Sequence, residues 1–190
     1  KIKAAERAIE VLAEAVKMSP QEPAAAVNLV NMKLHKAALE DPDRSNVAKM
    51  ENEFIALTEK FPQSPVVYTA LARFYLRPVL GHSYMVKAAD AADKALKLKP
   101  QDVVNSINCA EAYARKYACT NDRQYIDKAL EIAKNALKLD GAQLSKGPRQ
   151  YGNRMHRIFL YSFVANHSLD QLITRDKGDL VSDKETLAVD

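Results

Sequence analysis

The chain has 190 residues, of which 47% are apolar and 27% charged, with a formal net charge of +4. This apolar content suffices for one domain or a short array of repeats, and so small a net charge does not demand a nucleic-acid partner. Five glycines, no tryptophan and no sustained apolar–polar alternation favour an all-α chain over a sheet. The longest apolar run, residues 158–165, is shorter than the roughly 18–20 residues of a membrane span, so no span is predicted.

The first residue is Lys1, and no signal-peptide pattern follows it, which indicates a fragment or processed chain whose targeting signal is missing. Cys109 and Cys119 stand ten residues apart. On one helix they would be about 15 Å apart, too far for a disulfide. No Cys-x-x-Cys motif supports zinc binding or dithiol chemistry. Thiols outside disulfides favour a soluble protein of a reducing compartment such as the cytoplasm.

Four segments share one amphipathic pattern, beginning with a predicted helix over residues 3–18. In each segment, the residues twelve, eight and five places before a proline or glycine stop are small or apolar. Such internal repetition indicates stacked units rather than one closed core. The four copies are Ala8, Leu12 and Ala15 before Pro20; Met50, Phe54 and Leu57 before Pro62; Ala88, Ala92 and Ala95 before Pro100; and Ala129, Ala133 and Ala136 before Gly141.

The first three stops are each followed by a second kind of predicted helix, which opens the next unit. These opening helices cover residues 24–39, 66–76 and 103–117, and Ser64 and Asp102 can accept cap hydrogen bonds for the last two. Each opening helix contains a matching pair of adjacent residues. A long side chain stands four places after the first residue of this pair. The sets are Leu29-Val30 with Lys33, Leu71-Ala72 with Tyr75, and Cys109-Ala110 with Tyr113.

This layout resembles the tetratricopeptide repeat family, whose units are paired antiparallel helices. Tyr68, Leu71, Ala72 and Tyr75 match the first helix of that repeat, and Ala8, Leu12, Ala15 and Pro20 match the second. The resemblance implies a right-handed α-solenoid of stacked antiparallel helix pairs over residues 1–175. Its parts would be a closing helix 3–18, helix pairs 23–61, 65–99 and 102–140, and an atypical capping helix within 149–174, followed by a polar tail 176–190.

The repeats are longer than those of the family. Stops at 20, 62, 100 and 141 are spaced by 42, 38 and 41 residues, against about 34 in tetratricopeptide repeats. The extra residues fall inside each unit, at 41–46, 78–83 and 120–123, so enlarged inner turns are expected.

No catalytic or metal-binding motif is present. The four histidines are scattered over separate elements, without the convergent spacing that a metal site needs. A Gly-rich phosphate loop and a Gly-x-Ser-x-Gly elbow are also missing. The carboxylates of Asp90, Asp93, Glu51 and Glu53 are interpreted as solvent-facing helix charges. The sequence therefore predicts no enzyme, no cofactor and no metal.

The resemblance implies a concave face lined by the opening helices. Family members that clamp a carboxylate use lysines there, and Val27, Val66 and Ala70 stand at the corresponding places. We expect a non-catalytic scaffold that binds a peptide or helix of a partner protein on this face. The candidate partner-binding residues are Asn28, Asn31, His35, Thr69, Arg73, Arg77, Asn108, Glu111 and Arg115.

The residues leave two alternative functions open. Residues 146–163 hold arginines among aromatic residues, such as Arg154 beside Tyr151, a combination that can stack on RNA or single-stranded DNA. Aromatic residues at helical spacing are more often core, so this alternative is weighed lower. The other alternative is an accessory domain of a larger enzyme, with catalysis in flanking sequence.

Overall fold

The computed structural model describes residues 1–41, 45–77, 80–81 and 83–143, and within these ranges it contains helices and no strand. The all-α prediction is confirmed. The α-helices are α1 (Ile2–Met18), α2 (Pro23–Glu40), α3 (Glu51–Lys60), α4 (Pro65–Tyr75), α5 (Tyr84–Leu98), α6 (Val103–Thr120) and α7 (Arg123–Gln143), and a 3-10 helix η1 (Ser45–Met50) precedes α3.

Local capping explains several helix ends. The Glu22 carboxylate accepts a hydrogen bond of 3.2 Å from the backbone N–H of Ala24 at the start of α2, where Pro23 is the first helical residue. Asp102 accepts one of 3.0 Å from the N–H of Asn105 and so caps α6 as predicted. Ser64 stands at the N-cap position of α4, before Pro65, as predicted, but the expected hydrogen bond is wrong, because the Ser64 side chain makes no cap hydrogen bond.

The predicted end of the last repeat is also wrong. Helix α7 continues through Gly141 to Gln143. Glycine costs about 1 kcal/mol relative to alanine inside a helix, but it keeps its backbone N–H, so it does not force a stop as proline does. The capping helix predicted within 149–174 and the tail 176–190 lie outside the described residues.

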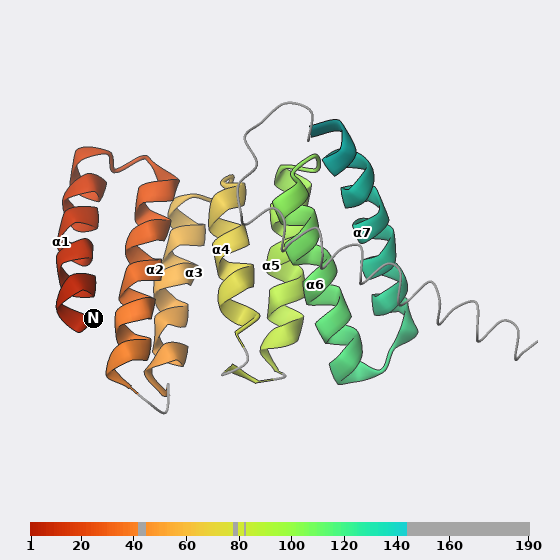
Figure 1. Ribbon diagram of the computed structural model, residues 1–190, viewed down its shortest axis with the longest axis horizontal. Helices are drawn as coiled ribbons and strands as arrows, with labels where there is room; N and C mark the ends of the chain where they lie inside the picture. The colour runs from red at the N-terminus through yellow and green to blue at the C-terminus, as the bar shows by residue number, and fades with distance from the viewer. Residues whose placement is uncertain (42–44, 78–79, 82, 144–190) are drawn as a thin grey trace, which may run out of the picture.

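The helices stand side by side in a row with α1 at one end, and each runs antiparallel to its neighbours in the chain (Figure 1). Besides these chain neighbours, α2 contacts α4 and α4 contacts α6. The three even-numbered helices therefore form one continuous surface, on which the candidate site lies.

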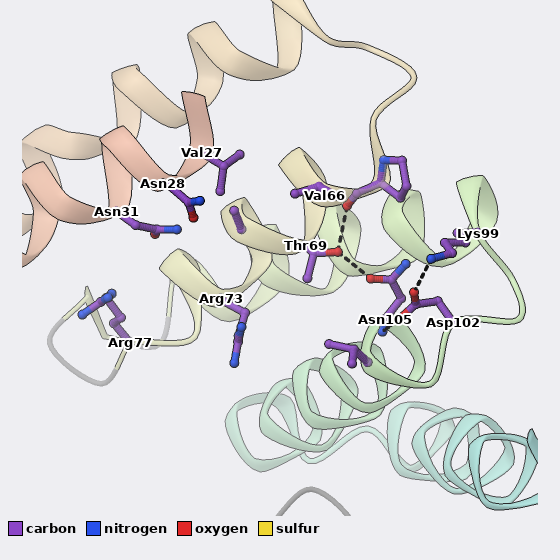
Figure 2. Close-up of a pocket in the computed structure, with 13 residues that line it drawn as sticks. Val27, Asn28, Asn31, Val66, Thr69, Arg73, Arg77, Lys99, Asp102 and Asn105 are labelled. Atoms are coloured by element: carbon purple, nitrogen blue, oxygen red, sulfur yellow. Dashed lines mark hydrogen bonds and ion pairs between the residues drawn. The ribbon is translucent and has the colours of Figure 1, made fainter. Parts of the chain in front are cut away.

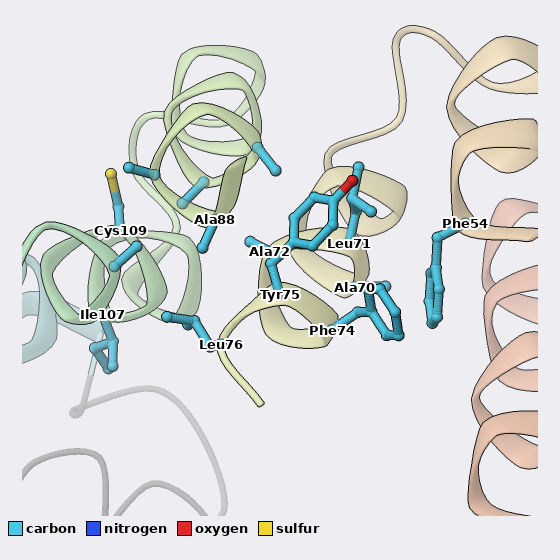
Figure 3. Packing of buried hydrophobic residues seen from close by; sticks show 14 of the residues in the cluster. Phe54, Ala70, Leu71, Ala72, Phe74, Tyr75, Leu76, Ala88, Ile107 and Cys109 are labelled. Atoms are coloured by element: carbon cyan, nitrogen blue, oxygen red, sulfur yellow. The ribbon is translucent and has the colours of Figure 1, made fainter. Parts of the chain in front are cut away.

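The largest buried side chains meet between α3 and α4. The rings of Phe54 and Phe74 stack with their centroids 4.9 Å apart, and both are almost completely buried (Figure 3). From α5 onward the core contains many small side chains beside larger ones such as Ile107 and Leu130, and the small ones allow neighbouring helices to approach closely. The buried alanines of this part are Ala88, Ala89, Ala91, Ala92, Ala95, Ala110, Ala112, Ala129, Ala133 and Ala136.

Substitution of one of these alanines tests the close packing. We expect Ala95→Leu, at a site that is 1% exposed, to lower the free energy of unfolding by roughly 1–3 kcal/mol through overpacking. The matched control is Lys97→Leu, which adds a leucine to the exposed side of the same helix and should change stability by less than about 0.5 kcal/mol. Equal effects of the two changes in urea unfolding would contradict the packing assigned to Ala95.

The carboxylates that were interpreted as solvent-facing are instead part of the helix packing, except Asp90, which is exposed. Asp93 on α5 accepts hydrogen bonds from the Tyr113 hydroxyl, from the Cys109 thiol (3.4 Å) and from the Lys128 ammonium (3.1 Å). These donors come from α6 and α7, so one carboxylate joins three consecutive helices. The interpretation of Asp93 as a solvated charge was wrong because its helix has neighbours on both sides.

The same arrangement occurs two helices earlier in the chain. Glu51 on α3 accepts hydrogen bonds of 2.8 Å from the hydroxyl of Tyr75 on α4 and of 2.8 Å from the ammonium of Lys87 on α5. Each lysine also lies over the ring of its tyrosine, with Lys87 Nζ 5.7 Å from the Tyr75 centroid and Lys128 Nζ 4.1 Å from the Tyr113 centroid. We call each set of carboxylate, tyrosine and lysine a triad.

On α2, Lys33 stands at the sequence position that matches Tyr75 and Tyr113. Its ammonium forms an ion pair of 2.7 Å with Glu53 on α3, so the contact to a neighbouring helix has different chemistry. Residues 33, 75 and 113 thus each bond to a helix next to their own.

Candidate functional site

A hollow in the described surface lies where α2, α4 and α6 meet (Figure 2). Its volume is about 640 Å³. We call it the α2/α4/α6 groove. It is lined by Val27, Asn28, Asn31, Pro65, Val66, Thr69, Ala70, Arg73, Arg77, Lys99, Asp102, Val104 and Asn105.

One side of the groove is held by hydrogen bonds between α4 and α6. The Thr69 hydroxyl can donate to the Pro65 carbonyl oxygen (2.7 Å) or to Asn105 Oδ1 (2.5 Å), and Asn105 Nδ2 donates to the Ala95 carbonyl oxygen (3.4 Å). Asn105 is buried, so these bonds satisfy its amide away from water. Thr69 and Asn105 therefore stabilise the groove wall.

The edge of the groove carries an ion pair between Lys99 Nζ and Asp102 Oδ2, 2.8 Å apart. Burial by itself raises the pKa of Asp102, but the hydrogen bonds from Lys99 and from the backbone N–H of Asn105 outweigh it. The net effect lowers the pKa of Asp102 below its usual value, so this carboxyl is ionised at neutral pH. The two charges offset each other at this edge.

The opposite side of the groove presents polar groups that are not used inside the protein. Asn28 and Asn31 lie three residues apart on one face of α2, and Arg73 projects from α4 (Figure 2). All three are exposed, and within the described part of the chain their side chains make no hydrogen bond or ion pair. Two amides can donate to and accept from a peptide backbone, and a guanidinium binds a carboxylate in a bidentate way.

An apolar wall stands between these polar groups. Val27 and Ala70 are buried at the base of the groove, whereas the side chains of Val66 and Val104 are exposed on α4 and α6. Exposed valines beside unpaired amides and an arginine offer contact area as well as hydrogen bonds, which is the composition of ligand-binding surfaces.

Five of the predicted site residues lie in this groove: Asn28, Asn31, Thr69, Arg73 and Arg77. The other four do not line it. His35 is exposed on α2 beyond the groove, and Asn108 is 5% exposed with an Nδ2 atom that has no hydrogen-bond partner among the described residues.

Glu111 and Arg115 serve the packing of α6 instead. Arg115 donates a hydrogen bond of 2.6 Å to the carbonyl oxygen of Leu76, at the end of α4, and a second of 2.6 Å to Glu111 Oε1. Arg115 was expected to bind a partner protein, but it forms a structural contact between α4 and α6 instead.

The groove also contains residues that sequence reasoning did not assign to it, namely Pro65, Lys99, Asp102 and Asn105. The sequence did contain a signal for Asn105. At the place four residues before Leu29, Leu71 and Cys109, the three opening helices hold Ala25, Val67 and Asn105. The third helix therefore has a polar amide where the other two have an apolar side chain.

The described ranges hold no group of three or more His, Cys, Asp and Glu side chains that could bind a metal ion. No helix in them has the length and apolar character needed to cross a membrane. The arginine- and aromatic-rich residues 146–163, the alternative nucleic-acid site, lie outside the described residues.

No protein-family model matches this chain, and no curated protein shows significant sequence similarity to it.

Proposed function

We propose that this protein is a non-catalytic scaffold that binds a segment of a partner protein in the α2/α4/α6 groove. In this proposal the helices form a right-handed solenoid of stacked antiparallel pairs of the tetratricopeptide type. Such arrays bury apolar surface between neighbouring units and leave one long face available for binding.

The repetition of contacts supports the repeat proposal. The triads Glu51–Tyr75–Lys87 and Asp93–Tyr113–Lys128 occupy successive helices in the same order. Their tyrosines fall at the position that recurs in the opening helices. A repeated sequence position that makes a repeated contact is the property expected of stacked units.

The observation that carries the binding proposal is the unpaired polar set of Asn28, Asn31 and Arg73 beside exposed valines. Exposed polar groups without a partner inside the protein are hydrogen-bonded to water, so they do not lower its stability. They can bond to a ligand without first breaking a contact inside the protein. The ligand that fits best is a peptide segment with an acidic side chain for Arg73 and an aliphatic side chain for the valines.

Selection from a random peptide library tests the proposal. We expect the protein to enrich peptides that combine an acidic and an aliphatic residue. Fluorescence anisotropy with a selected peptide should show Arg73→Ala weakening binding roughly 10- to 100-fold, because a charge-assisted hydrogen bond contributes about 1.5–3 kcal/mol.

The matched control is His35→Ala, which changes another exposed side chain of the same surface outside the groove and should leave affinity unchanged. Circular dichroism should show both variants folded, because both positions are exposed. Failure to enrich any peptide, or equal affinity of wild type and Arg73→Ala for every selected peptide, would contradict binding in this groove.

A further inference from the structure

The α2/α4/α6 groove follows helix α4 from one end to the other (Figure 2). Its lining on this helix begins at Pro65, the first residue of α4, and reaches Arg77, just past the last turn. At 1.5 Å per residue this is a length of about 18 Å. The lining residues of α2 and of α6 cover little more than one turn of each helix, so a bound segment lies along α4.

The groove is too small to hold a helix of this length. A helix about 18 Å long and about 10 Å across occupies about 1,400 Å³, whereas the groove has a volume of about 640 Å³. A polyproline II segment of the same length contains only about six residues, because each of them advances the chain by about 3.1 Å. The helix needs about twelve. The size of the groove therefore favours an extended segment.

Asn28 and Asn31 also favour an extended segment. Both are exposed on α2, and their side-chain amides make no hydrogen bond within the described part of the chain. An asparagine amide can donate and accept, so it can pair with the N–H and C=O groups of a peptide backbone. In a helix these backbone groups already bond to one another, whereas in polyproline II they are solvated and available.

The distance between the apolar and the charged part of the groove sets the spacing of the side chains that it can bind. Val66 and Arg73 stand seven residues apart on one face of α4, about 10.5 Å along the helix axis. In polyproline II, residues three places apart lie on the same side and about 9.3 Å from each other. In a flat strand they lie on opposite faces. Two side chains three places apart in a polyproline II segment can therefore reach Val66 and Arg73 together.

The charges of the groove decide which of these two side chains is acidic. At the end that carries Val66 and Val104, Lys99 and Asp102 form an ion pair and offset each other. Arg73 is exposed and makes no hydrogen bond or ion pair within the described part of the chain, so its guanidinium can bind a carboxylate. The acidic residue therefore belongs at Arg73 and the aliphatic residue at the valines.

We propose that the partner segment in this groove has a polyproline II conformation, with an acidic and an aliphatic residue three places apart. This inference rests on the proposed function and specifies the ligand of the same groove. The aliphatic side chain packs against Val66 and Val104, and the carboxylate binds Arg73. The backbone between the two side chains bonds to Asn28 and Asn31, which a helical segment could not do.

Fluorescence anisotropy with labelled synthetic peptides tests the spacing. Three proline- and alanine-rich peptides of the same composition carry one aspartate and one leucine, placed two, three or four residues apart. We expect the peptide with the spacing of three to bind at least fivefold more tightly than the other two. A fourth peptide, stapled as a helix with the aspartate and the leucine seven residues apart, should also bind more weakly.

A double variant of the protein tests the contact with the backbone. Asn28→Ala/Asn31→Ala should weaken binding of the peptide with the spacing of three at least fivefold, because two backbone hydrogen bonds are lost. The matched control is Asn135→Ala, which removes an exposed asparagine of α7 and should leave the affinity unchanged. All three positions are exposed, so circular dichroism should show folded variants.

The results separate this inference from the proposed function. Equal affinity for the three spacings, tighter binding of the helical peptide, or no effect of the double asparagine variant would overturn the polyproline II ligand. In each of these cases a loss of affinity on Arg73→Ala would still support binding in the groove. Peptides selected from the library that bind there, when none of the four synthetic peptides does, would also overturn this inference alone. A protein that binds no peptide at all would overturn both.

Discussion

Phe54→Ala is expected to lower the free energy of unfolding by about 3–5 kcal/mol, the largest effect we predict for a single substitution. The side chain is fully buried and its ring stacks on Phe74 at 4.9 Å. Its removal leaves a cavity between α3 and α4 and takes away the partner of a buried ring. Urea unfolding followed by circular dichroism measures the loss.

The neighbouring residue supplies the control. Ile55 follows Phe54 on α3 but is 37% exposed, so Ile55→Ala should cost at most about 1 kcal/mol. A loss for Phe54→Ala as small as that for Ile55→Ala would mean that α3 does not hold its ring against α4. The aromatic stack would then not be the main contact between these two helices.

Asp93→Ala is expected to cost about 2–3 kcal/mol, because it removes the common acceptor of three donors. Tyr113, Cys109 and Lys128 then keep their polar groups at a partly buried junction without the carboxylate. The matched control is Asp90→Ala on the exposed side of α5, which should change stability by less than about 0.5 kcal/mol. Equal losses in urea unfolding would contradict the role given to the triad.

The triad also predicts how stability depends on pH. Burial tends to raise the pKa of Asp93, but hydrogen bonds from Tyr113, Lys128 and Cys109 outweigh it and lower that pKa in the folded protein. The stabilisation is therefore present above the unfolded pKa of about 4 and is lost as the pH falls towards the folded pKa. Acid unfolding of Asp93→Ala should show a weaker dependence on pH below about 4 than the wild type shows.

At alkaline pH the tyrosine of the triad acts in the opposite direction. Burial, followed by the hydrogen bond to Asp93, raises the pKa of Tyr113 to about 12. Its contribution to stability is complete below the unfolded pKa of about 10 and is lost as the pH rises towards about 12.

Much of the helix order follows from local sequence signals. Proline at the first helical position, the Asp102 cap and the spacing of small residues predicted helix positions that agree with the structure to within a few residues. The end of α7 could not be predicted in this way, because a glycine such as Gly141 lowers helix stability without preventing the helical hydrogen bond.

The candidate site was less predictable, for a reason that Arg115 illustrates. Sequence spacing places Arg115 on the same stripe as Arg73, but Arg115 reaches the Leu76 carbonyl whereas Arg73 bonds to nothing in the described residues. Whether an arginine on this stripe is available therefore depends on which groups of the neighbouring helices lie within its reach. That is a tertiary property, and no local pattern encodes it.

The row of helices has a consequence for how the chain folds. Each helix contacts chiefly the helices next to it in the sequence, so the contact order is low and few long loops must close before favourable contacts form. Folding can begin at the aromatic junction around α4 and extend outward one helix at a time.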